Sequence, residues 1–315
     1  MSPEPTVNLL CDRAKMLQKA RQFFSERNIL EVDCCALRPR AAIDANIDVI
    51  SASVSDQETG YLHTSPEYAM KRLLSAKIGD IYFLGHVFRK GDIGPLHNPE
   101  FTMAEWYRIG ISFADLIQET CAFLFLFISP LPIRTLSYRD AFAQYVGIDY
   151  SKATLTELRA KAKALSAHDS PNWNRDTYIH FLLSHAIEPR LGQGELTVFT
   201  DYPPHEAALA QVVEKQGELV AERFEIYCNG IELANGYHEL GDAKELRRRF
   251  QQENAIRSSL NKETYLLDEP FLASMGSYFP ECCGVSVGID RALMIRRQAK
   301  TIREVLPFAW DGEQR

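Results

Sequence analysis

The stretch that decides the fold is FRKGDIGPLHNPEFTMAEWY, residues 88–107. It joins two runs that are typical of β-strands, residues 81–88 and 100–108, through a polar loop rich in glycine and proline. We therefore predict an antiparallel hairpin with a long loop. Arg89 opens this loop, where its planar guanidinium can bind a phosphate or a carboxylate through two hydrogen bonds.

The chain before this hairpin predicts two helices and two strands. Apolar residues at helical spacing indicate a helix over residues 7–27, and strands are expected over 29–37 and 60–63. Ser65-Pro66-Glu67 is typical of a helix start, because serine caps, proline fits the first turn and glutamate faces the positive end of the helix dipole. A helix over residues 68–74 follows.

The chain after the hairpin is helical first and strand-like later. Helical periodicity broken by prolines runs over about residues 111–200, which we interpret as a helical insertion. Asn229-Gly230 predicts a two-residue hairpin turn between strands at 222–228 and 231–240. A further strand over 283–287 leads into a helix near Gly288.

Composition excludes several classes of protein. The 315 residues are 46% hydrophobic and 24% charged, which argues against disorder, collagen and disulfide-stapled miniproteins. The net charge of −7 does not favour a nucleic-acid binder. Seven cysteines without metal-site spacing indicate reduced thiols, and no membrane span or secretory signal is visible. We expect a cytoplasmic protein.

Common catalytic motifs are missing from the sequence. There is no G-x-x-x-x-G-K-[ST] loop, no G-x-G-x-x-G after a strand, no G-x-S-x-G and no H-E-x-x-H. What stands out is a set of glutamates in the predicted C-terminal hairpin, spaced seven apart: Glu225, Glu232 and Glu239. Outward-facing strand glutamates are the simple interpretation. Three of them in an apolar hairpin instead favour a site, in which Glu225 and Glu232 converge on a hard cation.

Two motifs bring a family resemblance. Residues 88–107 and Gly288-Ile-Asp-Arg291 resemble motifs 2 and 3 of the lysine-type class II aminoacyl-tRNA synthetases. Ser65-Pro66-Glu67 and residues 232–239, ELANGYHE, are similar in particular to the elongation factor P lysine lysyltransferases, the PoxA/GenX family. The resemblance covers nearly the whole chain.

The resemblance implies a fold and a reaction. The expected fold is α+β, an antiparallel sheet flanked by helices, in a single catalytic domain over residues 1–315. No anticodon-binding OB domain is expected, since the first helix begins close to Met1. The implied enzyme is a homodimeric, ATP- and Mg²⁺-dependent ligase. It activates α-lysine or β-lysine as an adenylate and passes it to a lysine ε-amino group of elongation factor P, without tRNA.

The resemblance also implies residue roles. Arg89 and Arg291 stabilise charge on the reacting phosphates as the catalytic pair. The residues that bind ATP are Arg89, His97, Asn98, Phe101, Glu232, Leu233, Gly288 and Arg291. Those around the amino acid are Ser65, Pro66, Glu67, Glu105, Tyr107, Glu239 and Ser286. Within that set, Glu67 and Glu105 take the α-amino group, and Tyr107 and Glu239 take the distal ammonium. Magnesium is held by Glu225 and Glu232.

Three positions depart from the family pattern. Gly91 stands where motif 2 has a glutamate for the adenine amino group, and Cys35 stands where motif 1 has a proline at the dimer interface. Ser286 stands where lysyl-tRNA synthetases have glycine, which bears on the choice of lysine isomer. Two alternatives to the lysyltransferase stay open. One is a non-catalytic amino-acid or nucleotide sensor, motivated by Gly91, and the other is aminoacylation of tRNA or a small molecule.

Overall fold

The computed structural model describes residues 6–165 and 173–310, which belong to two compact units. The first unit joins Met1–Ser129 to Gly236–Arg315, and the second is Pro130–Asn235. The boundary on the return path falls inside strand β11 (Ile231–His238). The chain therefore leaves the first unit once and comes back along a strand.

The sheet of the first unit is built around the predicted hairpin. Its strand order is β1 (Leu30–Glu31), β5 (Ile81–Phe88), β6 (Glu100–Ile109) and β12 (Cys282–Gly288). β6 pairs antiparallel with both β5 and β12, and β1 pairs parallel with β5. The long-looped antiparallel hairpin is confirmed. Its register sets Phe83 opposite Glu105 on one side and Ser286 opposite Glu105 on the other.

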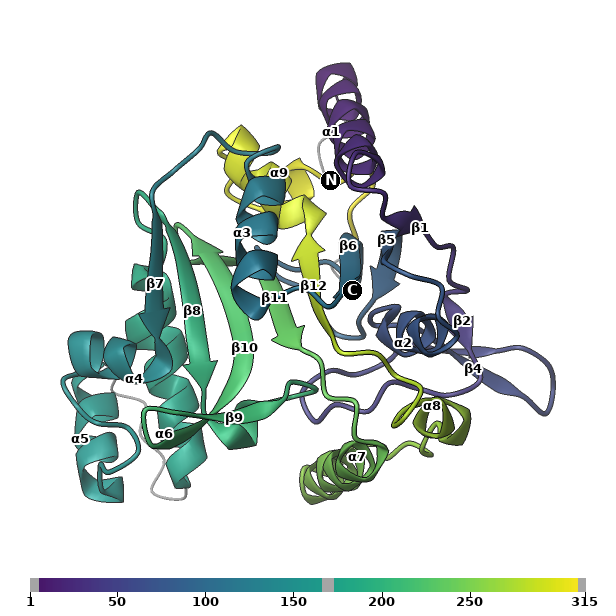
Figure 1. Ribbon diagram of the computed structural model, residues 1–315. Helices are drawn as coiled ribbons and strands as arrows, with labels where there is room; N and C mark the ends of the chain where they lie inside the picture. The colour runs from purple at the N-terminus through teal and green to yellow at the C-terminus, as the bar shows by residue number, and fades with distance from the viewer. Residues whose placement is uncertain (1–5, 166–172, 311–315) are drawn as a thin grey trace. The chain divides into compact units, whose positions relative to one another are not determined.

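Helix α2 (Glu67–Ser75) packs against this sheet through its apolar residues. Met70 and Leu74 are fully buried in one cluster with Ile81 and Tyr107. The other helices of the unit, seen in Figure 1, are α1 (Val7–Ser25), α3 (Phe113–Leu124), α7 (Ala243–Ser259), α8 (Glu269–Ser274) and α9 (Ile289–Arg297). A small second sheet contains β2 (Leu37–Arg38), β4 (Thr59–Leu62) and β3 (Ser51–Ser53), in that order.

A buried arginine ties α1 to the end of the sheet. The guanidinium of Arg13 donates to the Asp290 carboxylate at 2.5 Å and to the Thr102 hydroxyl at 2.6 Å. The second oxygen of Asp290 accepts the main-chain N–H of Thr102. Asp290 is the second residue of α9, so this network fixes the start of the helix that carries Arg291.

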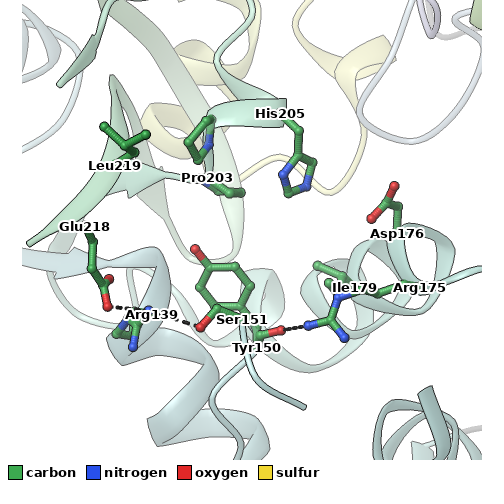
Figure 2. A pocket seen from close by; sticks show the side chains of 11 residues that line it. Arg139, Tyr150, Ser151, Arg175, Asp176, Ile179, Pro203, His205, Glu218 and Leu219 are labelled. Atoms are coloured by element: carbon green, nitrogen blue, oxygen red, sulfur yellow. Dashed lines mark hydrogen bonds and ion pairs between the residues drawn. The ribbon is translucent and has the colours of Figure 1, made fainter. Parts of the chain in front are cut away.

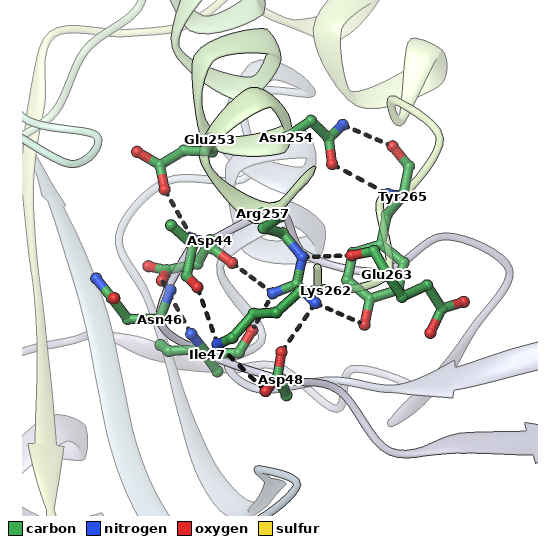
Figure 3. Close-up of polar contacts among 11 residues, drawn as sticks. Asp44, Asn46, Ile47, Asp48, Glu253, Asn254, Arg257, Lys262, Glu263 and Tyr265 are labelled. Carbon is green, nitrogen blue, oxygen red and sulfur yellow. Dashed lines mark hydrogen bonds and ion pairs between the residues drawn. The ribbon is translucent and has the colours of Figure 1, made fainter. Parts of the chain in front are cut away.

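A second buried arginine, Arg257 on α7, anchors the loop that precedes β3 (Figure 3). Its guanidinium donates to the main-chain oxygens of Asp44, Ile47 and Glu263, and to the Asp48 carboxylate at 2.8 Å. Because each acceptor belongs to an irregular segment, one side chain satisfies backbone groups that no strand or helix pairs.

The second unit has its own sheet and helices. β8 (Leu196–Tyr202) pairs parallel with β7 (Ile133–Ser137) and antiparallel with β10 (Glu218–Cys228), and β9 (Val212–Lys215) lies on β10. The α-helices are α4 (Tyr138–Ala141), α5 (Leu155–Leu165) and α6 (Arg175–Leu182), with π-helical turns at Phe142–Val146 and Leu183–Ile187. β10 turns into β11 at Asn229-Gly230, whose φ angles of 52° and 74° confirm the predicted two-residue turn.

Some element predictions differ from the structure. The segment interpreted as a helical insertion at about 111–200 begins with α3 of the first unit, and β7 and β8 flank the helices of the second. β7 lies just after two prolines, and it is a strand because it pairs with β8 across some sixty residues of sequence, which no local pattern reveals. Of the strand expected over 29–37, only Leu30–Glu31 and Leu37–Arg38 are extended and paired.

The second unit contains a cavity of about 480 Å³ (Figure 2). The two arginines that line this cavity already have partners. Arg139 pairs with Asp149 at 3.0 Å and with Glu218 at 2.7 Å, and Arg175 donates to the main-chain oxygens of Ala153 and Tyr150.

Among the described helices of the chain, none has the length and apolarity that crossing a bilayer requires.

Candidate active site

The first unit gathers a buried cluster of acidic side chains on the face of the sheet that α2 covers. Glu105 on β6 is 3% exposed, and its carboxylate accepts hydrogen bonds from the hydroxyls of Ser65, at 2.6 Å, and Tyr107, at 2.9 Å. The Ser65 hydroxyl in turn accepts the main-chain N–H of Glu67. Pro66, predicted at the first helical position, directly precedes α2 as its N-cap. The helix start thus orients the buried carboxylate.

Two more carboxylates meet in this cluster through a lysine. Lys71 on α2 is fully buried, and its ammonium lies 2.6 Å from a carboxylate oxygen of Glu67 and 2.6 Å from one of Glu239. Glu239 follows β11 and is 2% exposed, and its N–H donates to the main-chain oxygen of Cys282 on β12. The predicted residues Glu67, Glu105, Tyr107 and Glu239 therefore belong to one buried cluster.

Burial dominates the protonation of these groups. It raises the pKa of the Glu105 carboxyl to about 8, helped by the negative charge of Glu67. It also raises the pKa of Glu239 to about 7, against the opposing effect of Lys71. For Lys71, burial lowers the pKa, but the Glu239 and Glu67 carboxylates raise it by more, so the ammonium stays charged.

A glycine on β12 makes room for the pocket. Gly284 lies opposite Tyr107, and a Cβ there would overlap the Tyr107 ring and the Glu239 carboxylate. Ser286, two residues further along β12, lies opposite Glu105 and therefore shares its face of the sheet. The predicted contact between Ser286 and the amino-acid pocket agrees with this register.

Arg89 directly follows β5, at the mouth of the motif 2 loop. Its buried Nε has no hydrogen-bond partner among the described residues, and its guanidinium lies 5.1 Å from the centre of the Phe101 ring. A buried guanidinium nitrogen without an acceptor is costly, so an anionic ligand is the natural partner.

The rest of the motif 2 loop contacts motif 3. Arg291 donates to the Nε2 of His97 at 2.8 Å and to the main-chain oxygen of Leu96. Burial and the Arg291 charge lower the pKa of His97, consistent with a neutral ring that accepts. Gly288 caps α9 just ahead of Arg291. The loop and helix α9 therefore bring His97 and Arg291, which are both predicted to bind ATP, into contact.

The side chain of Asn98 is buried and does not lie open to a nucleotide. It is 8% exposed, its amide nitrogen donates to the main-chain oxygen of Glu100, and its amide oxygen accepts the N–H of Trp310. Both ends of the amide thus hold the loop in shape. Gly91, at φ 83°, has the left-handed conformation that favours glycine over a glutamate at this position of the loop.

In the second unit, Glu225 on β10 is buried, and its two oxygens accept from Arg223 and from the Tyr227 hydroxyl, each at 2.6 Å. Burial and the charges of Glu225 and Glu232 raise the pKa of Glu188 to about 7. Arg223 balances the charge of Glu225, and the described residues hold no cluster of three or more His, Cys, Asp or Glu ligands, so the magnesium site stays a prediction. Leu233 is 2% exposed.

Comparisons with known proteins identify the class of this fold and pocket. The family of class II tRNA synthetases (D, K and N) matches residues 3–311. An elongation factor P–(R)-β-lysine ligase of Haemophilus ducreyi is 40% identical over 311 residues, which are 97% of this chain and 95% of that relative. Ligases of the same name from Avibacterium paragallinarum and Haemophilus influenzae are 40% and 41% identical, over 98% of this chain and 98% and 97% of those relatives.

These matches define the chain first as a protein of the class II synthetase type, as the sheet and the acidic pocket indicate. Within that type, the chain belongs to the family of the elongation factor P–(R)-β-lysine ligases. The predicted α+β fold class and the family resemblance are confirmed.

Two residues of these sites escaped the sequence analysis. Lys71 lies four residues after Glu67, which is the helical spacing of an ion pair, on the same face as the apolar Met70 and Leu74. A lysine on a buried helix face was the available signal. Glu188 lies in a 3₁₀ turn far from Glu225 in sequence, and no spacing connects them.

Proposed function

We propose that this protein is an ATP-dependent ligase that activates a lysine-type amino acid as its adenylate and transfers it to a lysine of elongation factor P. The observation that carries the proposal is the pocket of three carboxylates, Glu67, Glu105 and Glu239, in the first unit. A diamino acid presents two ammonium groups, and buried carboxylates are their natural partners. The near full-length relatives carry the same activity in their names.

The two steps balance without a redox partner. The carboxylate oxygen of the amino acid attacks the α-phosphorus of ATP, and pyrophosphate leaves. The ε-amino group of the acceptor lysine then attacks the acyl carbon, loses a proton, and AMP leaves. Arg89 neutralises charge at the carboxylate and α-phosphate, and Arg291 does so at the departing phosphates.

Other residues hold the substrates. Glu67 and Glu105 take the α-amino group, Tyr107 and Glu239 the distal ammonium, and Ser65, Pro66 and Ser286 border the pocket. Phe101 stacks on adenine beside Arg89, while His97, Asn98, Gly288 and, through its main chain, Leu233 shape the nucleotide site. Glu225 and Glu232 would hold Mg²⁺, which would supply positive charge to the reaction when bound. A cytoplasmic location, expected from seven cysteines without metal-site spacing, stays a prediction.

ATP–pyrophosphate exchange tests the first step. We expect exchange with at least one of α-lysine, (R)-β-lysine and (S)-β-lysine, and none without an amino acid. Incubation with ATP, the active isomer and elongation factor P should then add the mass of one lysine residue to the factor, measured by intact mass spectrometry. A folded protein that exchanges with no isomer would favour the sensor; exchange without added mass would favour another acceptor.

A further inference from the structure

Lys71 is a buried charge to which the proposed reaction gives no part. It lies on the face of α2 that also carries Met70 and Leu74, between the helix and the sheet, and none of its side chain is exposed. Burial of an ammonium is costly, so a lysine in this place needs compensating contacts.

Its contacts join the two ends of the amino-acid pocket. The Lys71 ammonium is 2.6 Å from Glu67 and 2.6 Å from Glu239, so the two carboxylate oxygens lie no further apart than twice that distance. Under the proposed function, Glu67 receives the α-amino group and Glu239 the distal ammonium. One protein ammonium therefore touches both of the carboxylates that must recognise opposite ends of the substrate.

Lys71 also sets the charge of the pocket. The negative charges of Glu67 and Glu239 raise the pKa of Glu105, and that of Glu67 also raises the pKa of Glu239. Lys71 opposes the effect of burial on Glu239, because the charge of its ammonium lowers the pKa that burial raises. A protonated carboxyl attracts a substrate ammonium much less than a carboxylate does.

We propose that Lys71 is a positioning residue for the amino acid. Its ammonium pairs with both Glu67 and Glu239 and fixes where their oxygens lie, so that the ammonium groups of the substrate find both carboxylates already in place. The inference rests on the proposed function for the assignment of the pocket. It differs from a purely structural ion pair, which would stabilise the fold without changing affinity for the amino acid.

The test compares Lys71→Met with Arg257→Met, which removes a buried cation from a different network of the same unit (Figure 3). In pyrophosphate exchange we expect Lys71→Met to raise the KM for the amino acid about tenfold or more, the equivalent of one hydrogen bond to a charged group. The KM for ATP should stay within about twofold, because Lys71 has no place in the phosphate contacts. Arg257→Met should change neither KM. An unchanged KM for the amino acid in Lys71→Met would overturn the proposal.

Calorimetric binding of α-lysine and β-lysine without ATP separates this inference from the proposed function. Wild-type protein that binds an isomer without exchanging, and binds it more weakly as Lys71→Met, would refute the ligase but keep the role of Lys71. Equal binding by both proteins, or no binding by either, would refute that role. If Lys71→Met does not fold, Lys71→Arg, which moves the charge, should raise the same KM by a smaller factor, and no rise would count against the proposal.

Discussion

At the scale of single residues, Glu105 makes stability depend on pH. Its pKa of about 8 lies above the ordinary glutamate value, so the folded protein holds a proton that the unfolded chain has released. Stability from this group is therefore complete below about pH 4 and is lost as pH rises through about 8, by up to about 1.4 kcal/mol per pH unit. Glu105→Gln has no such titration. Urea unfolding between pH 5.5 and 9 should show the variant gaining on the wild type as pH rises; a constant difference would contradict the assignment.

At Gly284, the neighbouring side chains leave no space for a Cβ atom. Gly284→Ala would drive a methyl group into Tyr107 and Glu239, and we expect a loss of about 1–3 kcal/mol in the free energy of unfolding, as for overpacked cores. Gly288→Ala is the matched control in the same strand, since its Cβ would meet nothing closer than 3.9 Å. Chemical denaturation of the two variants measures the difference. Equal losses would show that the methyl group finds space.

At the scale of elements, the sequence predicts what local patterns encode. β5 begins and ends as predicted and β6 extends one residue further, because apolar runs and a glycine-containing loop define both. The candidate arginines and glutamates follow from the family motifs, and the structure brings Glu67, Glu105 and Glu239 into one cluster. Lys71 and β7 were missed because their roles come from partners distant in sequence: Glu239 for the lysine and β8 for the strand.

The hydrogen bonds of Arg13 connect α1 to α9 and β6, and substitutions can measure how much they contribute to stability. Arg13→Met leaves the buried Asp290 carboxylate with one N–H donor, and we expect a loss of about 3 kcal/mol or more. Adding Asp290→Asn should restore part of it, since no uncompensated charge then remains. Arg296→Met, which breaks the partly exposed pair with Asp12 between the same helices, should cost less than about 1 kcal/mol. Urea unfolding of these variants decides; additive losses for the Arg13–Asp290 pair would refute the coupling.

At the scale of the whole molecule, several apolar side chains near the N-terminus are exposed in the part of the chain that the structure describes. Val7 and Leu10 on α1 are 76% and 41% exposed, and Leu30 on β1 and Leu37 on β2 are 51% and 44% exposed. Cys35, in place of the motif 1 proline, lies between these two strands and is also exposed. Exposed apolar groups gathered on consecutive elements are typical of an interface between subunits.

We therefore expect a homodimer formed through α1, β1 and β2. Light scattering during size-exclusion chromatography should give twice the 35.8 kDa chain mass at micromolar protein. Leu30→Asp places a charge on this surface and should shift the mass to that of one chain, because a buried unpaired carboxylate opposes association. Leu219→Asp on β10, where the leucine is 61% exposed, is the matched control and should stay dimeric. A wild-type protein with the mass of one chain would refute the dimer. A dimer that both substitutions leave intact would place the interface elsewhere.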